Sequence, residues 1–165
     1  MRPSRIVAPL ALTMALLLLG VRLALRPSPD PAIGRRFPHL ALMPLPGTPP
    51  LTDARLRAGH ATAVTLFASW CLPCRADAPA LAALRARGVA VAGIAVRDAP
   101  ADAAGFLAAT HTRLDAGGID ARERTQVALG TAGIPETWLV DGDGVIRARV
   151  RGTLQPDDVA RLAGR

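Results

Sequence analysis

The chain has 165 residues, half of them hydrophobic, which is enough for one folded domain with a buried core and too apolar for a disordered protein. Its formal net charge of +7 comes from 20 basic residues, all of them arginine. No run of arginines is longer than Arg35–Arg36 and aromatic residues make up only 3%, so a nucleic-acid-binding surface is not expected.

The N-terminal region predicts a membrane anchor. Two arginines precede an apolar run over residues 6–21, which reaches the roughly 20 residues that span a bilayer if Arg22 extends its side chain to the interface. A cleaved signal peptide is the alternative, but no small-residue cleavage site precedes Arg26. We therefore expect an uncleaved anchor over residues 1–25, with the following domain outside the cytoplasm.

A short tether and one domain make up the remainder. Residues 26–32 alternate proline with other residues, which is typical of a stiff, extended linker. The domain is expected to cover residues 33–165. It begins with a predicted strand over residues 37–43, which Pro38 confines to a sheet edge, and a short helix over residues 54–57.

Strand and helix patterns alternate through the rest of the domain. Apolar runs over residues 63–68 and 89–96 predict central strands. Period-two alternation after an Asp-Gly turn predicts a final hairpin. The order predicts an α/β fold with a central mixed sheet flanked by helices. We expect helices over residues 72–87 (kinked at Pro79), 101–110, 122–129 and 156–162, a loop through residues 116–118, and hairpin strands over residues 137–140 and 145–150.

The only two cysteines, Cys71 and Cys74, lie where a predicted strand is followed by a helix. The unpaired N–H groups and the dipole of a helix N-terminus favour the thiolate, which is the reactive form. We therefore predict that Cys71 is an exposed nucleophile with a lowered pKa and that Cys74, one turn later, resolves the mixed disulfide. Pro73 is tolerated in a first turn, and Trp70 is expected to shield one side of the sulfur.

Metal binding is a less favoured explanation of the cysteine pair. Only three histidines accompany it, and none has the spacing of a zinc-ligand motif, so neither a metal nor any cofactor besides the cysteine pair is expected. A metallochaperone that holds Cu(I) through the two thiolates is the alternative of a different class. A cis-proline beside the thiols would obstruct such a site.

Pro135 is the candidate for that cis-proline. It directly precedes a predicted strand and is flanked by turn residues, so the residues alone allow either a cis bond or an ordinary trans turn. A cis bond would present the backbone of Ile134 to an extended peptide substrate.

These motifs together resemble the thioredoxin-like superfamily. More narrowly, the chain is similar to the membrane-anchored thiol–disulfide reductases of cytochrome c maturation, the DsbE/CcmG group with its ResA and TlpA relatives. The likeness extends from about Ile33 to the C-terminus and implies a thioredoxin-like fold. The segments that carry it are Trp70-Cys-Leu-Pro-Cys74, Pro79, Gly133-Ile-Pro-Glu-Thr137, Leu139–Arg147 and Gly152.

The resemblance also implies a function. It implies a cis Pro135, a nucleophilic Cys71 and a resolving Cys74, in a protein anchored in the cytoplasmic membrane with its domain on the periplasmic side. The implied substrate is the pair of haem-binding cysteines of apocytochrome c, and the implied electron donor is a transmembrane dithiol transporter. A general thiol–disulfide exchange protein for other exported substrates is the alternative.

Two acids are candidates for proton transfer. Asp77 occupies a position that is commonly Glu in the group, and Glu136 matches the acidic residue after the cis-proline. Thioredoxins often bury an Asp six residues before the first cysteine, but this chain has Thr65 there. We therefore expect Asp77 and Glu136 to be partly buried carboxyl groups with raised pKa, and the alternative is that both are solvated surface acids.

Overall fold

The structure is a computed structural model and describes residues 14–18, 20, 30–131 and 133–164. The chain divides into two units, residues 1–30 and 31–165. In the first unit, residues 14–18 and 20 are helical. The rest of the predicted anchor and most of the tether lie outside the described residues. No helix in the part of the chain that the structure describes is both long enough and apolar enough to cross a membrane.

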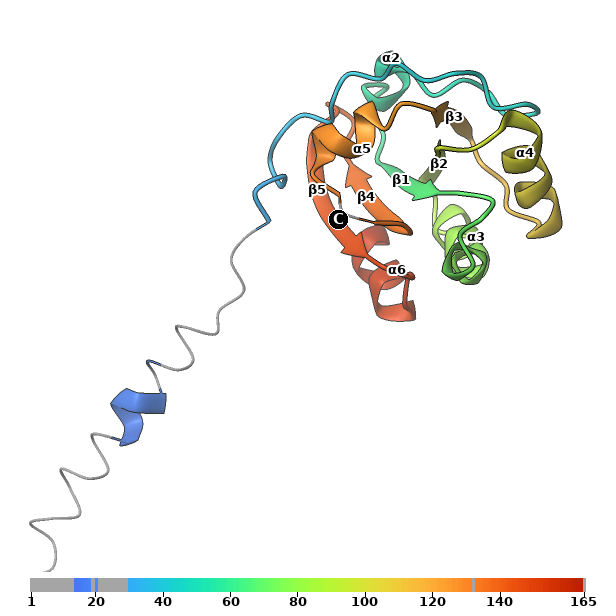
Figure 1. The fold of residues 1–165 in the computed structure, drawn as a ribbon. Helices are drawn as coiled ribbons and strands as arrows, with labels where there is room; N and C mark the ends of the chain where they lie inside the picture. The colour runs from blue at the N-terminus through green and yellow to red at the C-terminus, as the bar shows by residue number, and fades with distance from the viewer. Residues whose placement is uncertain (1–13, 19, 21–29, 132, 165) are drawn as a thin grey trace, which may run out of the picture. The chain divides into compact units, whose positions relative to one another are not determined.

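The second unit is built on a five-stranded mixed sheet (Figure 1), as the sequence predicts. Its strands follow the order β3-β2-β1-β4-β5. Strands β1, β2 and β3 are parallel to one another, β4 is antiparallel to β1, and β5 is antiparallel to β4. Because the three parallel strands are neighbours and their C-terminal ends lie at the same end of the sheet, the loops that follow them lie close together there. We call this end of the sheet the edge where the parallel strands end. The strands are β1 (Thr62–Phe67), β2 (Ala90–Val96), β3 (Ala116–Asp120), β4 (Glu136–Val140) and β5 (Ile146–Arg151).

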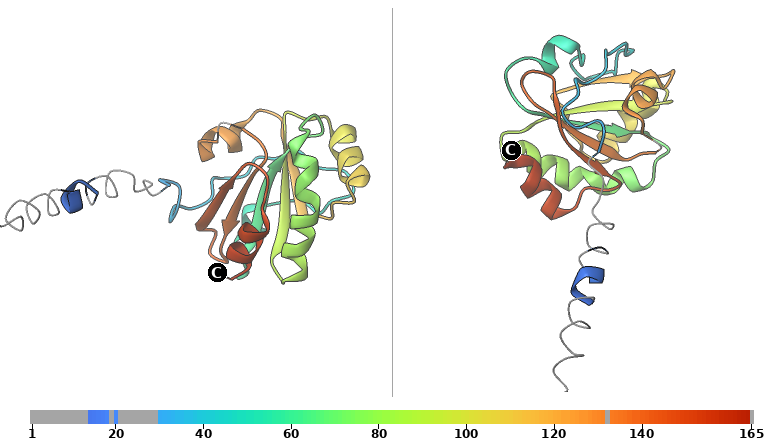
Figure 2. Two further views of the ribbon diagram at one scale, coloured as in Figure 1. Left: turned by 90° about the horizontal axis from the view of Figure 1, so that it is seen from below. Right: turned by 90° about the vertical axis from the view of Figure 1, so that its left-hand side faces the viewer.

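Helices cover both faces of this sheet (Figure 2). Helices α3 (Ala78–Ala86) and α6 (Pro156–Ala163) lie side by side on one face, and α4 (Pro100–Ala109) packs on the same face near the end of β1. The other face packs against α2 (Asp53–Leu56) and α5 (Arg124–Leu129). Successive side chains of β1 point to opposite faces of the sheet. Because both faces are covered, β1 is buried along its whole length.

The prediction of a loop through residues 116–118 is wrong, because these residues begin β3. Two glycines usually weaken a strand. Here Gly117 and Gly118 have no side chains, which leaves room for the segment that precedes α2 to pack closely against β3. A Cβ on Gly118 would lie 2.7 Å from Cβ of Leu42, and one on Gly117 would lie 3.0 Å from Cδ2 of Leu45. The predicted strand over residues 37–43 is also wrong. These residues form no strand, and Met43 alone makes an isolated bridge, to Ile119 of β3.

The predicted helix over residues 72–87 is divided in two. It begins as a 3₁₀-helix, η1 (Pro73–Asp77), and continues as α3. Pro79 lies in the first turn of α3, where backbone N–H groups have few helical acceptors, so the kink predicted inside the helix is wrong. The remaining predicted helices and strands are confirmed to within two residues at each end.

Leu84 tests how α3 is held on the sheet. Its side chain is fully buried among residues of the sheet and α6, so Leu84→Ala should lower the free energy of unfolding by about 2–5 kcal/mol. Denaturant unfolding of the disulfide-bonded protein measures the change. The control is Val127→Ala on exposed α5 surface, expected to change stability by less than about 0.5 kcal/mol. A loss at Leu84 no larger than the control's would contradict this packing.

Candidate active site

Cys71 and Cys74 follow β1 at the edge where the parallel strands end, and they form a disulfide with their Cα atoms 5.4 Å apart. The backbone N–H of Cys74 lies 3.2 Å from Sγ of Cys71 and donates a hydrogen bond to it. A donor of this kind stabilises negative charge on sulfur, so it favours the thiolate of Cys71 once the disulfide is reduced. The arrangement supports Cys71 as the nucleophile.

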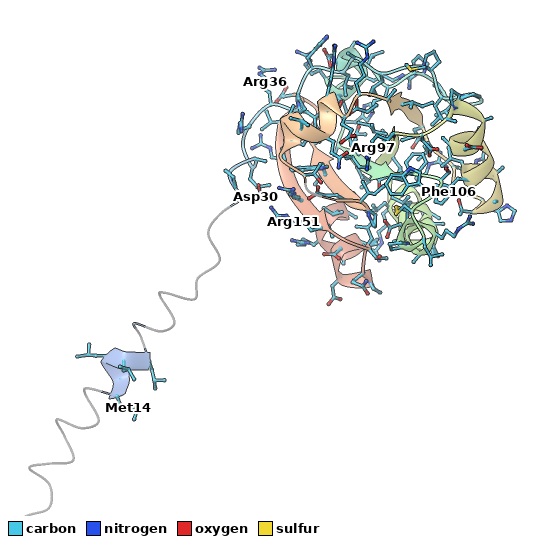
Figure 3. The ribbon with its side chains drawn as sticks, in the orientation of Figure 1. Met14, Asp30, Arg36, Arg97, Phe106 and Arg151 are labelled. Carbon is cyan, nitrogen blue, oxygen red and sulfur yellow. A yellow bond between two sulfur atoms is a disulfide. The ribbon has the colours of Figure 1, made fainter. Side chains whose placement is uncertain are left out.

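The prediction that Cys71 is exposed is wrong for the disulfide-bonded protein. Cys71 is only 4% exposed and Cys74 is equally buried. Both sulfurs belong to an apolar cluster with Phe67 from β1 and Phe106 from α4, against which Ile134 packs. Figure 3 shows sulfur beside α3, near the labelled Phe106.

The residues next to Cys71 are exposed instead. Trp70 is 55% exposed and Leu72 is 77% exposed, while Pro73 begins η1 and is also at the surface. The sulfurs are therefore covered, but they are flanked on the chain by apolar surface that a partner can contact.

The Ile134–Pro135 peptide bond is cis, as predicted. The register of β1 and β4 pairs Leu66 with Glu136, so Pro135 lies opposite the end of β1, next to the disulfide loop. No hydrogen bond joins the backbone N–H or C=O of Ile134 to another described residue. These groups are free to bind the backbone of an extended partner.

Asp77 is a buried acid of the kind the sequence predicts. It is 2% exposed, and its Oδ1 accepts a hydrogen bond of 2.8 Å from the backbone N–H of Leu154. Its Oδ2 has no hydrogen-bond partner among the described residues. Burial raises the pKa of Asp77 to about 6, although the bond from Leu154 lowers it in part.

Asp77 lies on the same side of η1 as Cys74. A 3₁₀-helix has three residues per turn, so Asp77 lies one turn beyond Cys74 on the same buried side of η1. Thr65, in the position where thioredoxins often have an acid, is buried and bonded to the hydroxyl of Thr137 at 3.3 Å. Asp77 is therefore the buried acid that follows Cys74 on this side of η1.

Glu136 is also buried but has a fixed counter-charge. Arg149 Nε–H donates to its Oε1, and Arg151 Nε lies 3.8 Å from the same oxygen. The guanidinium of Arg149 is itself buried and stacks 4.3 Å from the centre of the Trp138 ring. This ion pair favours a structural role for Glu136, so the two acids are not equivalent.

Two side chains that make contacts near the site were not anticipated from the sequence. Arg149 is one, although its signal was present, since arginines alternate along β5 and the strand that pairs with it begins at Glu136. The other is Asp98, whose carboxylate accepts hydrogen bonds from the backbone N–H and the hydroxyl of Ser69, at 2.6 and 2.7 Å. An acid two residues after the end of a parallel strand is the signal that could have identified it.

Among the described residues, no group of three or more His, Cys, Asp or Glu side chains could hold a metal ion. The chemistry that this arrangement can perform is thiol–disulfide exchange between the cysteine pair and a disulfide brought by a partner.

Comparison with known proteins gives relatives in one group. The chain is 39% identical over 136 residues to the thiol:disulfide interchange protein HelX of Rhodobacter capsulatus, covering 81% of this chain and 76% of HelX. It is 38% identical over 130 residues to a DsbE homologue of Paracoccus denitrificans, covering 79% of this chain and 72% of that protein. No protein-family model matches the chain.

Solved structures have the same fold. A Chlorobium tepidum protein assigned as the thiol:disulfide interchange protein DsbE superimposes with a TM-score of 0.64 at 25% identity, covering 80% of this chain and 93% of that one. A secreted Mycobacterium tuberculosis disulfide oxidoreductase, at 21% identity, gives a TM-score of 0.64 over 76% of this chain and 95% of that one, and shows the fold alone. The predicted thioredoxin-like fold is confirmed.

The raised pKa of Asp77 predicts how stability depends on pH. Its pKa is about 6 in the folded protein and 3.8 in the unfolded chain, so between these values the folded state binds more protons and loses stability as pH rises. At pH 8 the buried charge costs roughly 3 kcal/mol. Asp77→Asn keeps an acceptor for Leu154, and should exceed wild-type stability at pH 8 but match it near pH 4.

Urea unfolding of the oxidised protein at the two pH values measures this difference. Asp143→Asn, on an exposed turn residue, is the matched control and should show no such dependence. An Asp77→Asn variant with the same stability difference from wild type at both pH values would contradict a buried, penalised charge.

The Glu136–Arg149 pair predicts a different result. Glu136→Gln leaves the buried guanidinium without its counter-charge and should lower the free energy of unfolding by about 3 kcal/mol at pH 7. The double variant Glu136→Gln/Arg149→Met removes both charges and should recover most of this loss. Arg161→Gln, which breaks an exposed pair with Asp158, should cost less than about 1 kcal/mol. Equal losses in the single and double variants would refute the pairing.

Proposed function

Because the chain belongs to the DsbE family of thiol:disulfide interchange proteins, we propose that it reduces the haem-binding cysteines of apocytochrome c during cytochrome c maturation. The protein is a thiol–disulfide oxidoreductase. In the proposed role it uses the Cys71–Cys74 pair as its redox group, with no other cofactor or metal.

The observation that carries the proposal is that the two sulfurs have different polar neighbours. Cys71 receives an N–H hydrogen bond at the start of η1, whereas Cys74 lies one turn before the buried carboxyl of Asp77. The cis-proline loop beside them has unpaired backbone groups at Ile134, which suits an extended, unfolded substrate such as an apoprotein.

The reaction starts from the reduced protein. The thiolate of Cys71 attacks one sulfur of the substrate disulfide, forms a mixed disulfide and releases the other sulfur as a thiolate. Asp77, ionised above pH 6, accepts the proton of Cys74. Cys74 then attacks Sγ of Cys71, the mixed disulfide breaks, and the second substrate thiolate leaves. Two electrons have passed to the substrate, and the protein holds the Cys71–Cys74 disulfide.

The reaction needs a donor that restores the dithiol. We assign this role to a transmembrane dithiol protein, because disulfides persist in the oxidising compartment where the substrate lies. The apolar run over residues 6–21 supports an uncleaved anchor at residues 1–25 and a tether over residues 26–32. In this proposal the domain lies on the periplasmic side of the cytoplasmic membrane, close to its donor.

Cysteine variants test the function directly. With a peptide that contains an oxidised C-x-x-C-H segment, Cys71→Ser should abolish reduction, because no nucleophile remains. Cys74→Ser should accumulate a mixed disulfide between Cys71 and the peptide, visible by mass spectrometry under non-reducing conditions. A matched C-x-x-C-A peptide is the control. Equal rates on both peptides would instead favour a general exchange protein for exported substrates, and no trapped complex would contradict the mechanism.

A further inference from the structure

Two neighbouring residues in the loop after β2, Arg97 and Asp98, contact the loop that carries Cys71. Asp98 accepts the hydrogen bonds from Ser69 described above. One residue earlier, the carbonyl of Arg97 accepts a hydrogen bond of 3.3 Å from Nε1 of Trp70, and the Arg97 guanidinium lies 5.7 Å from the centre of the Trp70 ring. Asp98 and Arg97 thus contact Ser69 and Trp70, the two residues directly before Cys71.

Arg97, labelled in Figure 3, is itself held from a third loop. Its Nε lies 3.0 Å from Oε1 of Glu123, in the loop after β3. Glu123 is anchored in turn, because its backbone N–H donates to the carbonyl of Asp120 and the Asp120 carboxylate accepts three backbone N–H groups at the start of α5. A continuous set of contacts therefore runs from the start of α5 to Trp70.

The backbone at this ion pair is unusual. Arg97 and Glu123 have φ of 47° and 56°, in the left-handed region that favours glycine. Among the described residues only His111 shares this property without being glycine. Both residues with this backbone conformation belong to the same ion pair.

We propose that Arg97 is a positioning residue, which holds the ring of Trp70, the residue directly before Cys71, so that Trp70 and Leu72 form an ordered docking surface for the polypeptide that carries the substrate disulfide. An exposed ring that is already fixed loses less freedom when a partner binds. A small disulfide needs only to reach the sulfur and gains nothing from this surface. The inference rests on the proposed function, since it concerns how the same site binds its polypeptide substrate.

Single-turnover kinetics of the reduced protein test this role. The probes are a peptide of about 15 residues with an oxidised C-x-x-C-H segment and, for comparison, hydroxyethyl disulfide. Loss of the exposed cation–π contact in Arg97→Gln should raise the half-saturating peptide concentration about two- to fivefold and leave the maximal rate unchanged. The rate with hydroxyethyl disulfide should stay within about twofold of wild type.

Matched variants separate positioning from a general loss of structure. Arg97→Lys retains a cation that can lie over the ring and should restore most of the peptide binding. Glu123→Gln removes the ion pair alone and should change peptide binding in the same direction as Arg97→Gln. Arg161→Gln also loses an arginine–carboxylate pair, but on α6, and should behave as wild type.

Fluorescence gives a readout independent of catalysis. Trp138 is fully buried, so acrylamide quenching reports on Trp70, which is the other of the two tryptophans. Arg97→Gln should increase the quenching, and Arg97→Lys should reverse the increase. Unchanged quenching with unchanged peptide binding would overturn the inference, as would equal rate losses with both disulfides. If the wild-type protein fails to reduce the peptide, the proposed function fails, while quenching still decides whether Arg97 positions Trp70.

Discussion

The common end of three parallel strands is the constraint on which the site depends. β1, β2 and β3 run in the same direction, so the loop with the cysteines, the loop with Arg97 and Asp98, and the loop with Glu123 all start at one edge. β4 runs antiparallel to β1, so it begins where β1 ends and brings Pro135 to that same edge. Strand direction together with the order β3-β2-β1-β4 brings these residues, which are far apart in the chain, to one end of the sheet.

Two buried carboxyl groups near this edge are accommodated in opposite ways. Glu136 pairs with Arg149, and the ring of Trp138 covers the guanidinium, so both charges are retained within the fold. Asp77 has one backbone hydrogen bond, and its pKa rises to about 6. A carboxyl group without a bound cation can lose and regain a proton near neutral pH, and this suits Asp77 rather than Glu136 to acid–base chemistry.

The sequence predicts those features that follow from local pattern. The cysteine spacing and the mixed sheet were accessible because each depends on a short motif or on the order of apolar runs. The cis form of Pro135 was implied only by the resemblance to a known family, because the residues alone allowed either isomer. The strand that contains Gly117 and Gly118 was not accessible, because its glycines are explained by Leu42 and Leu45 from another segment. The burial of Cys71 also depends on tertiary packing, which local pattern does not encode.

The different surroundings of the two sulfurs are consistent with the division of roles proposed for them. An apolar cluster disfavours a charged sulfur, so a thiolate at either cysteine needs a compensating interaction. Cys71 has that compensation in the N–H group of Cys74, which stabilises its thiolate. Cys74 lies one turn from Asp77, whose negative charge above pH 6 disfavours a second anion nearby while providing a base for its proton. In the proposed mechanism Cys71 therefore attacks the substrate, and Cys74 gives up its proton to Asp77 before it resolves the mixed disulfide.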